Sequence, residues 1–322
     1  MLEARSDFDG SFWFYIPNKG APIAFTILFA ASGFMHTYQC FRYKSWKVSG
    51  LLPWAASIFA VGFGIRAAAA FGRWNNLNLF IASSVFVLFG PPIYEVANFV
   101  TLGRILYYIP YHAPMHPGRV WTTFIAIGIM IELINSSGAA LLANSSNPEA
   151  QDVGKALLKA VLIMQLALMI GFVAVAGRFH YSCARAGVLN QNVKRVLSVL
   201  YTSCALITIR TTYRTVEYFT VSSFNVNVMD NVSPIVKDEW LFWVFEATLM
   251  FCNTTVLNIF HPMRCLPRSN KIYLATDGVT EIEGPGYEDR RAFIMTVIDP
   301  FDLYGLITNR GKQDRYWEGN AA

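Results

Sequence analysis

The segment IRTTYRTVEY, residues 209–218, decides what kind of protein this chain is. It closes an apolar run that is long enough to cross a bilayer as a helix. Arg210, Arg214 and Glu217 follow one another at i, i+4 and i+7, so they share one face of that helix. A charge at the centre of a membrane costs about 2.5–3.5 kcal/mol on the insertion scale. We therefore expect these side chains to point into the protein or a hydrated cavity, as candidate ligand-binding residues.

The composition of the whole chain supports a membrane protein. Apolar residues make up 54% of the 322 residues and charged residues only 15%, whereas soluble domains carry about 25% charged residues. This length accommodates seven helices of about 20 residues each, with short loops and a tail. The net charge of +5 does not indicate a nucleic-acid-binding protein, because the basic residues cluster near the ends of the apolar runs.

Seven apolar runs predict an all-α membrane protein with seven transmembrane helices. The predicted spans are residues 21–40, 51–71, 79–109, 120–143, 156–177, 196–219 and 240–260. The third is too long for a simple crossing, and Pro91 and Pro92 interrupt it, so we expect a kink or a broken helix there.

The charges of the loops predict the orientation. Basic residues follow the first, third, fifth and seventh spans, and the other loops are poorer in them, which places the N-terminus outside and the C-terminus in the cytosol. The predicted parts are a short exoplasmic tail (1–20), a transmembrane domain (21–262) and a mostly disordered cytosolic tail (263–322), in which residues 292–298 are a candidate short strand or helix. The sequon at Asn144 falls in an outer loop and is a candidate glycosylation site.

Ionisable residues recur within the predicted spans, four of each sign, and buried charges must be paired or hydrated. We expect Arg66 and Glu246 to join the charges of the sixth span in a polar cluster that opens toward the exoplasmic leaflet. The predicted ligand-binding residues are Arg66, Glu95, Asn98, Glu132, Arg210, Tyr213, Arg214, Glu217 and Glu246. The alternative is that these residues only hold the helices together, although interhelical polar contacts average about 0.6 kcal/mol and do not obviously offset several ionised groups.

The order Arg, two residues, Tyr-Arg, two residues, Glu at residues 210–217 resembles the signature of the fungal lipid-translocating exporter family. This is the family of proteins for resistance to 7-aminocholesterol and to sphingoid long-chain bases. Weaker agreements are Tyr94-Glu95, the run 102–105, the pattern Glu239, Trp243 and Glu246, and His261-Pro262. Two features depart from the family pattern: Glu132, Asn135 and Gly138 replace its fourth-helix pattern, and Glu246 replaces an Asp.

The resemblance implies seven helices with the N-terminus outside and the C-terminus inside, in a fungal membrane, which we expect to be the plasma membrane, with an endomembrane as the alternative. It also implies export or flip-flop of sphingoid bases and resistance to toxic amphiphiles. The expected partners are membrane lipids and amphiphilic small molecules, with no cofactor, no metal and no nucleic acid. For a sphingoid base, whose headgroup is an ammonium, we expect Glu217 and Glu246 to contact the amine, with Arg214 and Arg66 setting their ionisation.

Two other functions fit seven helices. A lipid-sensing receptor or regulator is the main alternative, although the outer loops lack the cysteines of the usual receptor disulfide. A zinc intramembrane hydrolase needs several histidines in the bundle. His112 and His116 have helical spacing, but prolines at 110, 114 and 117 preclude a regular helix there. We therefore predict a carrier rather than an enzyme.

Overall fold

The computed structural model describes residues 17–71, 76–114, 117–143, 147–222 and 238–284, together with Asp299, Tyr304 and Ile307. In these parts, seven helices are long and apolar enough to cross a membrane, which confirms the predicted all-α, multi-pass membrane protein. Six of them are α2 (Gly20–Tyr43), α4 (Leu51–Ala70), α5 (Leu77–Tyr108), α6 (Pro117–Ala143), α7 (Pro148–Arg185) and α8 (Gln191–Ser222). The last span consists of α10 (Glu239–Phe242), the π-helix η3 (Trp243–Thr248) and α11 (Leu249–Ile259).

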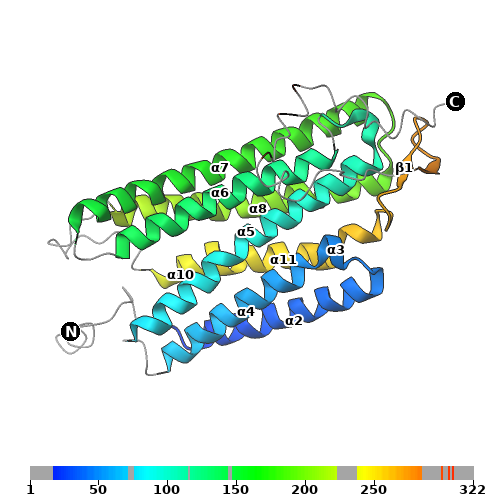
Figure 1. Cartoon of the computed structure of the whole chain (residues 1–322). Helices are drawn as coiled ribbons and strands as arrows, with labels where there is room; N and C mark the ends of the chain where they lie inside the picture. The colour runs from blue at the N-terminus through cyan, green and yellow to red at the C-terminus, as the bar shows by residue number, and fades with distance from the viewer. Residues whose placement is uncertain are drawn as a thin grey trace, which may run out of the picture.

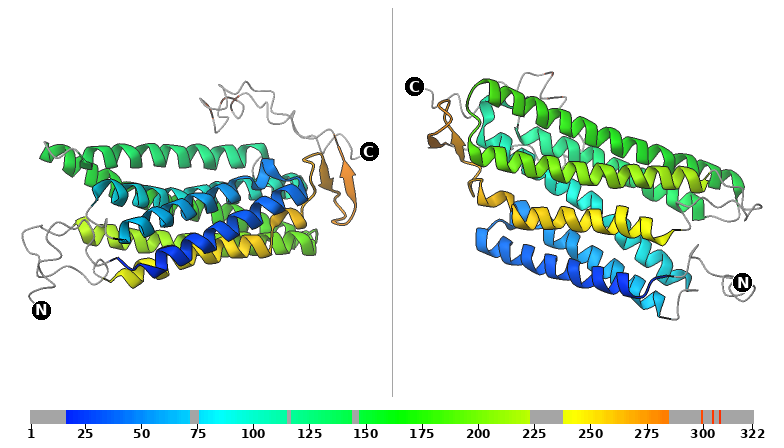
Figure 2. Two further views of the ribbon diagram at one scale, coloured as in Figure 1. Left: turned by 90° about the horizontal axis from the view of Figure 1, so that it is seen from below. Right: turned by 180° about the vertical axis from the view of Figure 1, so that it is seen from behind.

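The spans lie side by side in a bundle whose neighbours follow chain order (Figures 1 and 2). Helix α2 packs on α4, α4 on α5, and so on to α8, which packs on α11; α11 returns to α2 and closes the ring. Helix α5 also contacts α8 across the ring. The short helix α3 (Trp46–Ser49) connects α2 to α4, and single turns, η1 (Pro110–His112) and η4 (Pro262–Arg264), follow α5 and α11. Helices α5, α8 and the last span therefore form the centre of the bundle, where polar residues can meet.

Asparagine side chains cap the starts of four long helices, among them Asn190 before α8, whose Oδ1 accepts from the backbone N–H groups of residues 192 and 193. Asn18 Oδ1 accepts from the backbone N–H groups of residues 20 and 21, Asn76 Oδ1 from those of 78 and 79, and Asn147 Oδ1 from that of 150. Such caps satisfy N–H groups that have no partner within the helix. At the other end of α2, Lys44 adopts a left-handed conformation (φ 50°) and ends the helix.

Helix α5 passes through both of its prolines. Pro91 and Pro92 lie inside a continuous helix of 32 residues, so of the two expected outcomes the broken helix is wrong, and the kink stays a prediction. A helix inside a bundle tolerates proline because neighbouring helices and local adjustments compensate the lost hydrogen bonds. Gly90, next to the prolines, lets α5 approach α4 closely: a Cβ there would lie 2.2 Å from the Phe59 ring.

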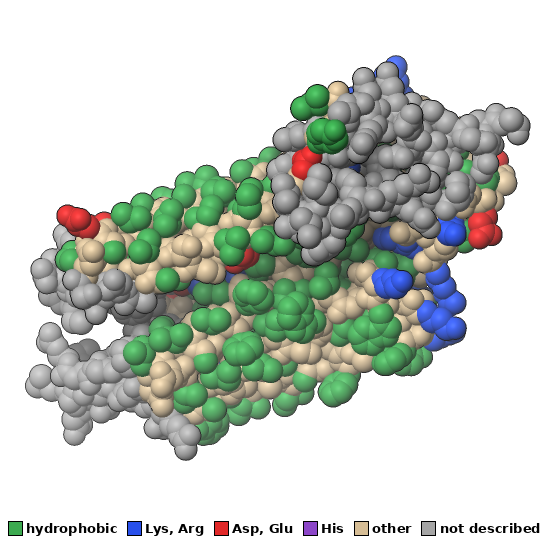
Figure 3. Space-filling model, in the orientation of Figure 1, with side chains coloured by type: hydrophobic (Ala, Val, Ile, Leu, Met, Phe, Trp, Pro, Cys, Tyr) green, Lys and Arg blue, Asp and Glu red, His purple; other side chains and the backbone are tan. Residues whose placement is uncertain are grey.

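The outside of the bundle is apolar and its core is aromatic. Phe34 and Ile170 are 79% and 67% exposed, and similar side chains cover the lipid-facing surface (Figure 3). Inside, Phe29 stacks on Phe59 with ring centroids 4.7 Å apart, and Phe59 also stacks on Tyr94. This cluster holds α2, α4 and α5 together.

A β-hairpin follows the last span and closes one end of the bundle. Strands β1 (Ile272–Leu274) and β2 (Glu281–Glu283) pair antiparallel, and Tyr108 at the end of α5 donates to Glu281 at 2.8 Å. Arg104 Nη2 donates to the carbonyl of Pro267 at 2.6 Å. The sequence does not predict this hairpin, because its strands have only three residues each. The sequon at Asn144, the N-terminal residues 1–16 and the candidate element at 292–298 lie outside the described residues.

Candidate functional site

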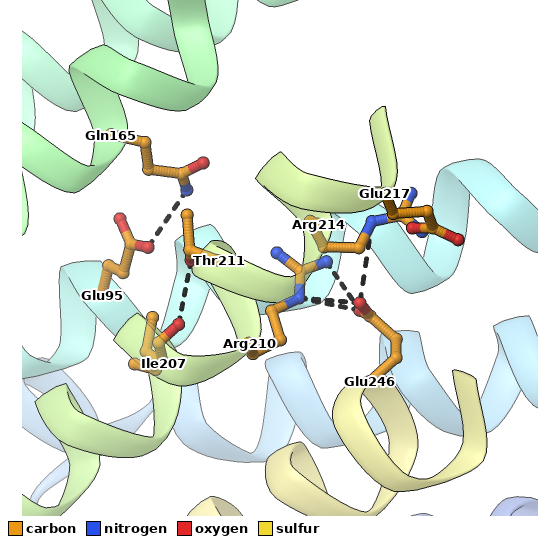
Figure 4. A network of polar contacts seen from close by, with 8 residues as sticks. All are labelled: Glu95, Gln165, Ile207, Arg210, Thr211, Arg214, Glu217 and Glu246. Atoms are coloured by element: carbon orange, nitrogen blue, oxygen red, sulfur yellow. Dashed lines mark hydrogen bonds and ion pairs between the residues drawn. The ribbon is translucent and has the colours of Figure 1, made fainter. Parts of the chain in front are cut away.

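Arg210, in the signature segment of α8, forms an ion pair that is buried inside the bundle. Arg210 Nε donates to both carboxylate oxygens of Glu246, each at 2.9 Å, and Nη2 donates to Oε1 at 2.6 Å (Figure 4). The side chains are 4% and 0% exposed. Their helices pack together, so the pair joins α8 to the last span. An Arg–carboxylate pair with several hydrogen bonds is strong and geometrically specific.

Arg214 and Glu217 extend this pair toward the surface. Arg214 Nη1 donates to Glu217 Oε2 at 2.5 Å, and its Nε lies 3.8 Å from Glu246 Oε2. The side chains of Arg214 and Glu217 are 24% and 21% exposed, unlike the sealed pair beside them. We refer to Arg210, Arg214, Glu217 and Glu246 as the ion cluster. It holds two positive and two negative groups, so its formal charge is zero, and one side of it is accessible.

The π-helix positions Glu246 and the ring beside it. Residues 243–248 adopt i→i+5 geometry, and the Thr248 hydroxyl donates to the Trp243 carbonyl at 2.8 Å. Single π turns inside helices are frequent at functional sites. Phe245, in the same turn, stacks on Tyr213 with ring centroids 5.2 Å apart. The predicted site residue Tyr213 therefore lies against an aromatic ring next to the ion cluster.

Arg66 occupies a second polar centre at the start of the last span. Its Nη2 lies 3.3 Å from Glu239 Oε1, and the other oxygen of Glu239 accepts from the backbone N–H of Asn18. The guanidinium also lies over the rings of Phe242 and Trp243, 4.2 and 5.2 Å from their centroids. Arg66 thus joins α4 to the start of the last span, and Glu239 links both to the start of α2. Among the described ion pairs, the partner of Arg66 is Glu239 rather than Glu246.

Of the remaining predicted residues, Glu95 and Asn98 make polar contacts between helices, and Glu132 makes one within its own helix. Glu95 on α5 accepts from Gln165 of α7 at 3.1 Å and lies within electrostatic range of Arg210 (Figure 4). Asn98 on α5 donates to Ser203 of α8 at 2.8 Å. Glu132 is only half-buried and accepts from Asn135 of its own helix at 3.2 Å. The structure therefore brings four of the nine residues into the ion cluster and distributes the others around it.

Sequence reasoning missed a neutral polar cluster between α2 and α11. The Thr254 hydroxyl lies 2.8 Å from Ser32 Oγ and 3.0 Å from His36 Nε2, and Asn258 Nδ2 donates to Ser32 Oγ at 2.7 Å. Both amide atoms of the fully buried Asn253 lack a hydrogen-bond partner among the described residues. The polar residues in apolar spans were visible in the sequence, but nothing in it indicated that α2 and α11 are neighbours.

Within the described residues, no three His, Cys, Asp or Glu side chains are arranged to hold a metal ion. Among the histidines of the described residues, His36 bonds to Thr254, His112 Nδ1 lies 3.2 Å from Ser182 Oγ, and His180 stacks on Tyr201. His116 lies outside the described residues.

The sequence is similar to fungal proteins with lipid-transport names. Residues 54–269 match the family model described as RTA1 like protein. A "Lipid-translocating exporter-like protein RTA1" of Leptosphaeria maculans is 41% identical over 295 residues, which cover 87% of this chain but only 57% of that relative. A protein of the same name from Ajellomyces capsulatus is 32% identical over 80% of this chain and 82% of its own length. The "Probable lipid transporter atnI" of Emericella nidulans is 24% identical, over 80% of this chain and 69% of its own length. No solved structure matches the chain.

Proposed function

Because this chain belongs to the RTA1-like protein family, we propose that it carries lipids or related amphiphiles across a membrane and so confers resistance to toxic ones. The match to the family model over residues 54–269 and the names of the relatives support a role in lipid transport. For the substrate we propose sphingoid long-chain bases, which combine one ammonium headgroup with a hydrocarbon chain. The carrier makes and breaks no covalent bond.

The ion cluster supplies the chemistry for an ammonium headgroup. An amine that enters from the accessible side reaches Glu217 first, because this carboxylate is 21% exposed whereas Glu246 is 0% exposed. The ammonium replaces Arg214 as the partner of Glu217, and Arg214 turns to Glu246, from which its Nε is only 3.8 Å distant. Each carboxylate keeps a cationic partner throughout, which avoids the cost of an unpaired buried charge. The position of Arg214 within 4 Å of both carboxylates is the observation on which the proposal depends.

We also propose that the N-terminus is outside, that the hairpin end is cytosolic and that the protein lies in the plasma membrane. Basic side chains gather near the hairpin end of the bundle (Figure 3). They include Arg42, Lys44, Arg185, Lys194 and Arg264, whereas Glu149, Asp152 and Asp238 lie at the opposite helix ends. Basic residues accumulate on the cytosolic side of membrane proteins. The ion cluster then lies nearer the exoplasmic leaflet, since α8 runs outward and Arg210 lies past its middle.

A liposome assay tests this function. The full-length protein is reconstituted with a fluorescent sphingoid base, and dithionite in the external buffer quenches only the outer leaflet. We expect nearly all of the probe to become quenchable in proteoliposomes and about half in empty liposomes. Glu217→Gln should reduce the rate at least tenfold, because a neutral amide cannot pair with the ammonium. Glu149→Gln, at the start of α7, is the matched control and should leave the rate unchanged.

The possible results separate carriers from regulators. If wild-type protein moves no sphingoid base or other amphiphile, the proposal is wrong, and a ligand-dependent change in a bound cytosolic partner would favour the lipid-sensing receptor. If Glu217→Gln lowers the amount of folded protein rather than the rate per folded molecule, the ion cluster is structural.

A further inference from the structure

A long apolar groove lies on the membrane-facing side of α7 and α8, outside the ion cluster. It has a volume of about 770 Å³ and is lined by three residues of α7, eight of α8 and Phe245. Thr208 and Thr212 contribute hydroxyls, but these donate to backbone carbonyls of α8 at 2.7 and 2.8 Å. The lining residues Ile170 and Ile209 are 67% and 47% exposed, so the groove opens laterally to the bilayer. It is therefore a site for hydrocarbon.

The shape of the groove fits one extended chain. Its lining on α8 runs from Tyr201 to Val216, which is about 22 Å along the helix axis. The hydrocarbon core of a bilayer is about 30 Å thick. A chain in the groove therefore lies along the membrane normal, with its head at one end of α8. The volume falls in the range of about 300–1,000 Å³ that is typical of ligand pockets.

A cation stands at the outer end of the groove. Lys159 of α7 precedes Ile170 by three helical turns, which places both on the same face of α7. Its Nζ lies 5.3 Å from the ring centroid of Phe219, which follows Val216 by one turn on α8. No ion pair between described residues involves Lys159, whereas Lys155 pairs with Asp152 at 3.0 Å. Lys159 lies where the apolar part of α7 begins, at the depth of lipid headgroups.

From this geometry we infer that the groove binds an anionic membrane phospholipid, with a hydrocarbon chain along α7 and α8 and the phosphate at Lys159. A sphingoid base does not fit this site, because Lys159 would repel its ammonium. The site is thus separate from the proposed substrate site and does not depend on transport. Its wall is next to the ion cluster in the sequence: the stacked rings of Tyr213 and Phe245 line the groove, and Phe245 immediately precedes Glu246. A hydrocarbon chain bound in the groove would pack against the rings of Tyr213 and Phe245 and hold them in place.

Lipid binding to the purified full-length protein tests the inference. Native mass spectrometry measures the affinity for phosphatidylglycerol and for phosphatidylcholine with identical chains. We expect wild-type protein to prefer phosphatidylglycerol, and Lys159→Gln to weaken its binding about fivefold. Lys155→Gln is the matched control and should change it less than twofold, since this ammonium is already paired. Ala205→Phe fills the groove and should weaken both lipids.

Several results would overturn this site. These are equal affinities for the two lipids, equal effects of Lys159→Gln and Lys155→Gln, and unchanged binding in Ala205→Phe with a wild-type melting temperature. Dimers that dissociate in Ala205→Phe and bind no lipid would show that a second copy of the chain fills the groove. Failure of the liposome transport assay would leave the lipid affinities unaffected, so the two proposals can fail separately.

Discussion

Arg210 and Glu246 meet side-on in the centre of the bundle, with three hydrogen bonds of 2.6–2.9 Å between a guanidinium and a carboxylate that are both nearly inaccessible. The pair connects the signature segment of α8 to the π turn of the last span. Taking two charges out of water is costly, so such a pair contributes little net stability even when its geometry is good. Breaking it is a different matter, because one charge is then left without its partner.

Arg210→Gln should therefore destabilise the protein by about 3–5 kcal/mol, since Glu246 would remain buried with its partner charge removed. The double variant Arg210→Met, Glu246→Leu should lose much less, because no buried charge remains. Thermal unfolding of the purified proteins in one detergent measures both. Equal losses in the single and double variants would mean that Arg214 or water compensates Glu246.

Arg66 should not tolerate lysine. Its guanidinium combines an ion pair to Glu239 with the faces of Phe242 and Trp243, at 4.2 and 5.2 Å from the centroids. A lysine keeps the charge but loses the flat stacking surface, and a cation over an aromatic ring contributes about 0.5–2 kcal/mol. We expect Arg66→Lys to lower stability by about 1–2 kcal/mol in thermal unfolding. Arg178→Lys, outside this centre, is the control; a similar loss there would rule out a specific role for the rings.

Much of this fold can be predicted from the sequence, because hydrocarbon imposes a simple requirement. A segment that crosses it must be apolar for about 20 residues, and all seven such segments form helices. The residues at which each helix begins and ends are less predictable. Helix α7 covers residues 148–185, whereas its apolar part suggested 156–177, since the polar extensions beyond the membrane leave no mark in hydropathy.

The candidate site, like the fold, was predictable only in part. The spacing of Arg210, Arg214 and Glu217 on one helix predicts their common face, because local periodicity is enough. The partner of each charge depends on which helices become neighbours and on their rotation. Arg66 could not be assigned to Glu239 in this way, nor could the shift that the π turn introduces before Glu246 be foreseen.

Gly154 and Gly171 make a matched test of packing, because both lie on α7. A Cβ on Gly154 would stand 2.7 Å from the Leu142 backbone nitrogen and 2.8 Å from the Gly138 carbonyl oxygen, whereas nothing lies within 4 Å at Gly171. Small residues permit this close approach of membrane helices. Gly154→Ala should cost about 1–3 kcal/mol in thermal unfolding. Gly171→Ala should be neutral or stabilising by up to about 1 kcal/mol, and the reverse order would refute the α6–α7 contact.

Asn253 and Asn98 provide the last test, of whether the neutral polar cluster serves stability or function. Both side chains are buried, but Asn98 donates to Ser203 at 2.8 Å, whereas neither amide atom of Asn253 has a partner among the described residues. An unsatisfied buried group costs about 1–3 kcal/mol, so Asn253→Leu should raise the melting temperature or leave it unchanged. Asn98→Leu should lower it, since Ser203 loses its donor. We further expect Asn253→Leu to slow translocation of the fluorescent base in liposomes, because a polar headgroup that crosses the bundle needs hydrogen-bonding groups below the ion cluster. If Asn253→Leu instead melts as early as Asn98→Leu while transport per folded molecule is normal, the amide is bonded within the fold and has no part in the pathway.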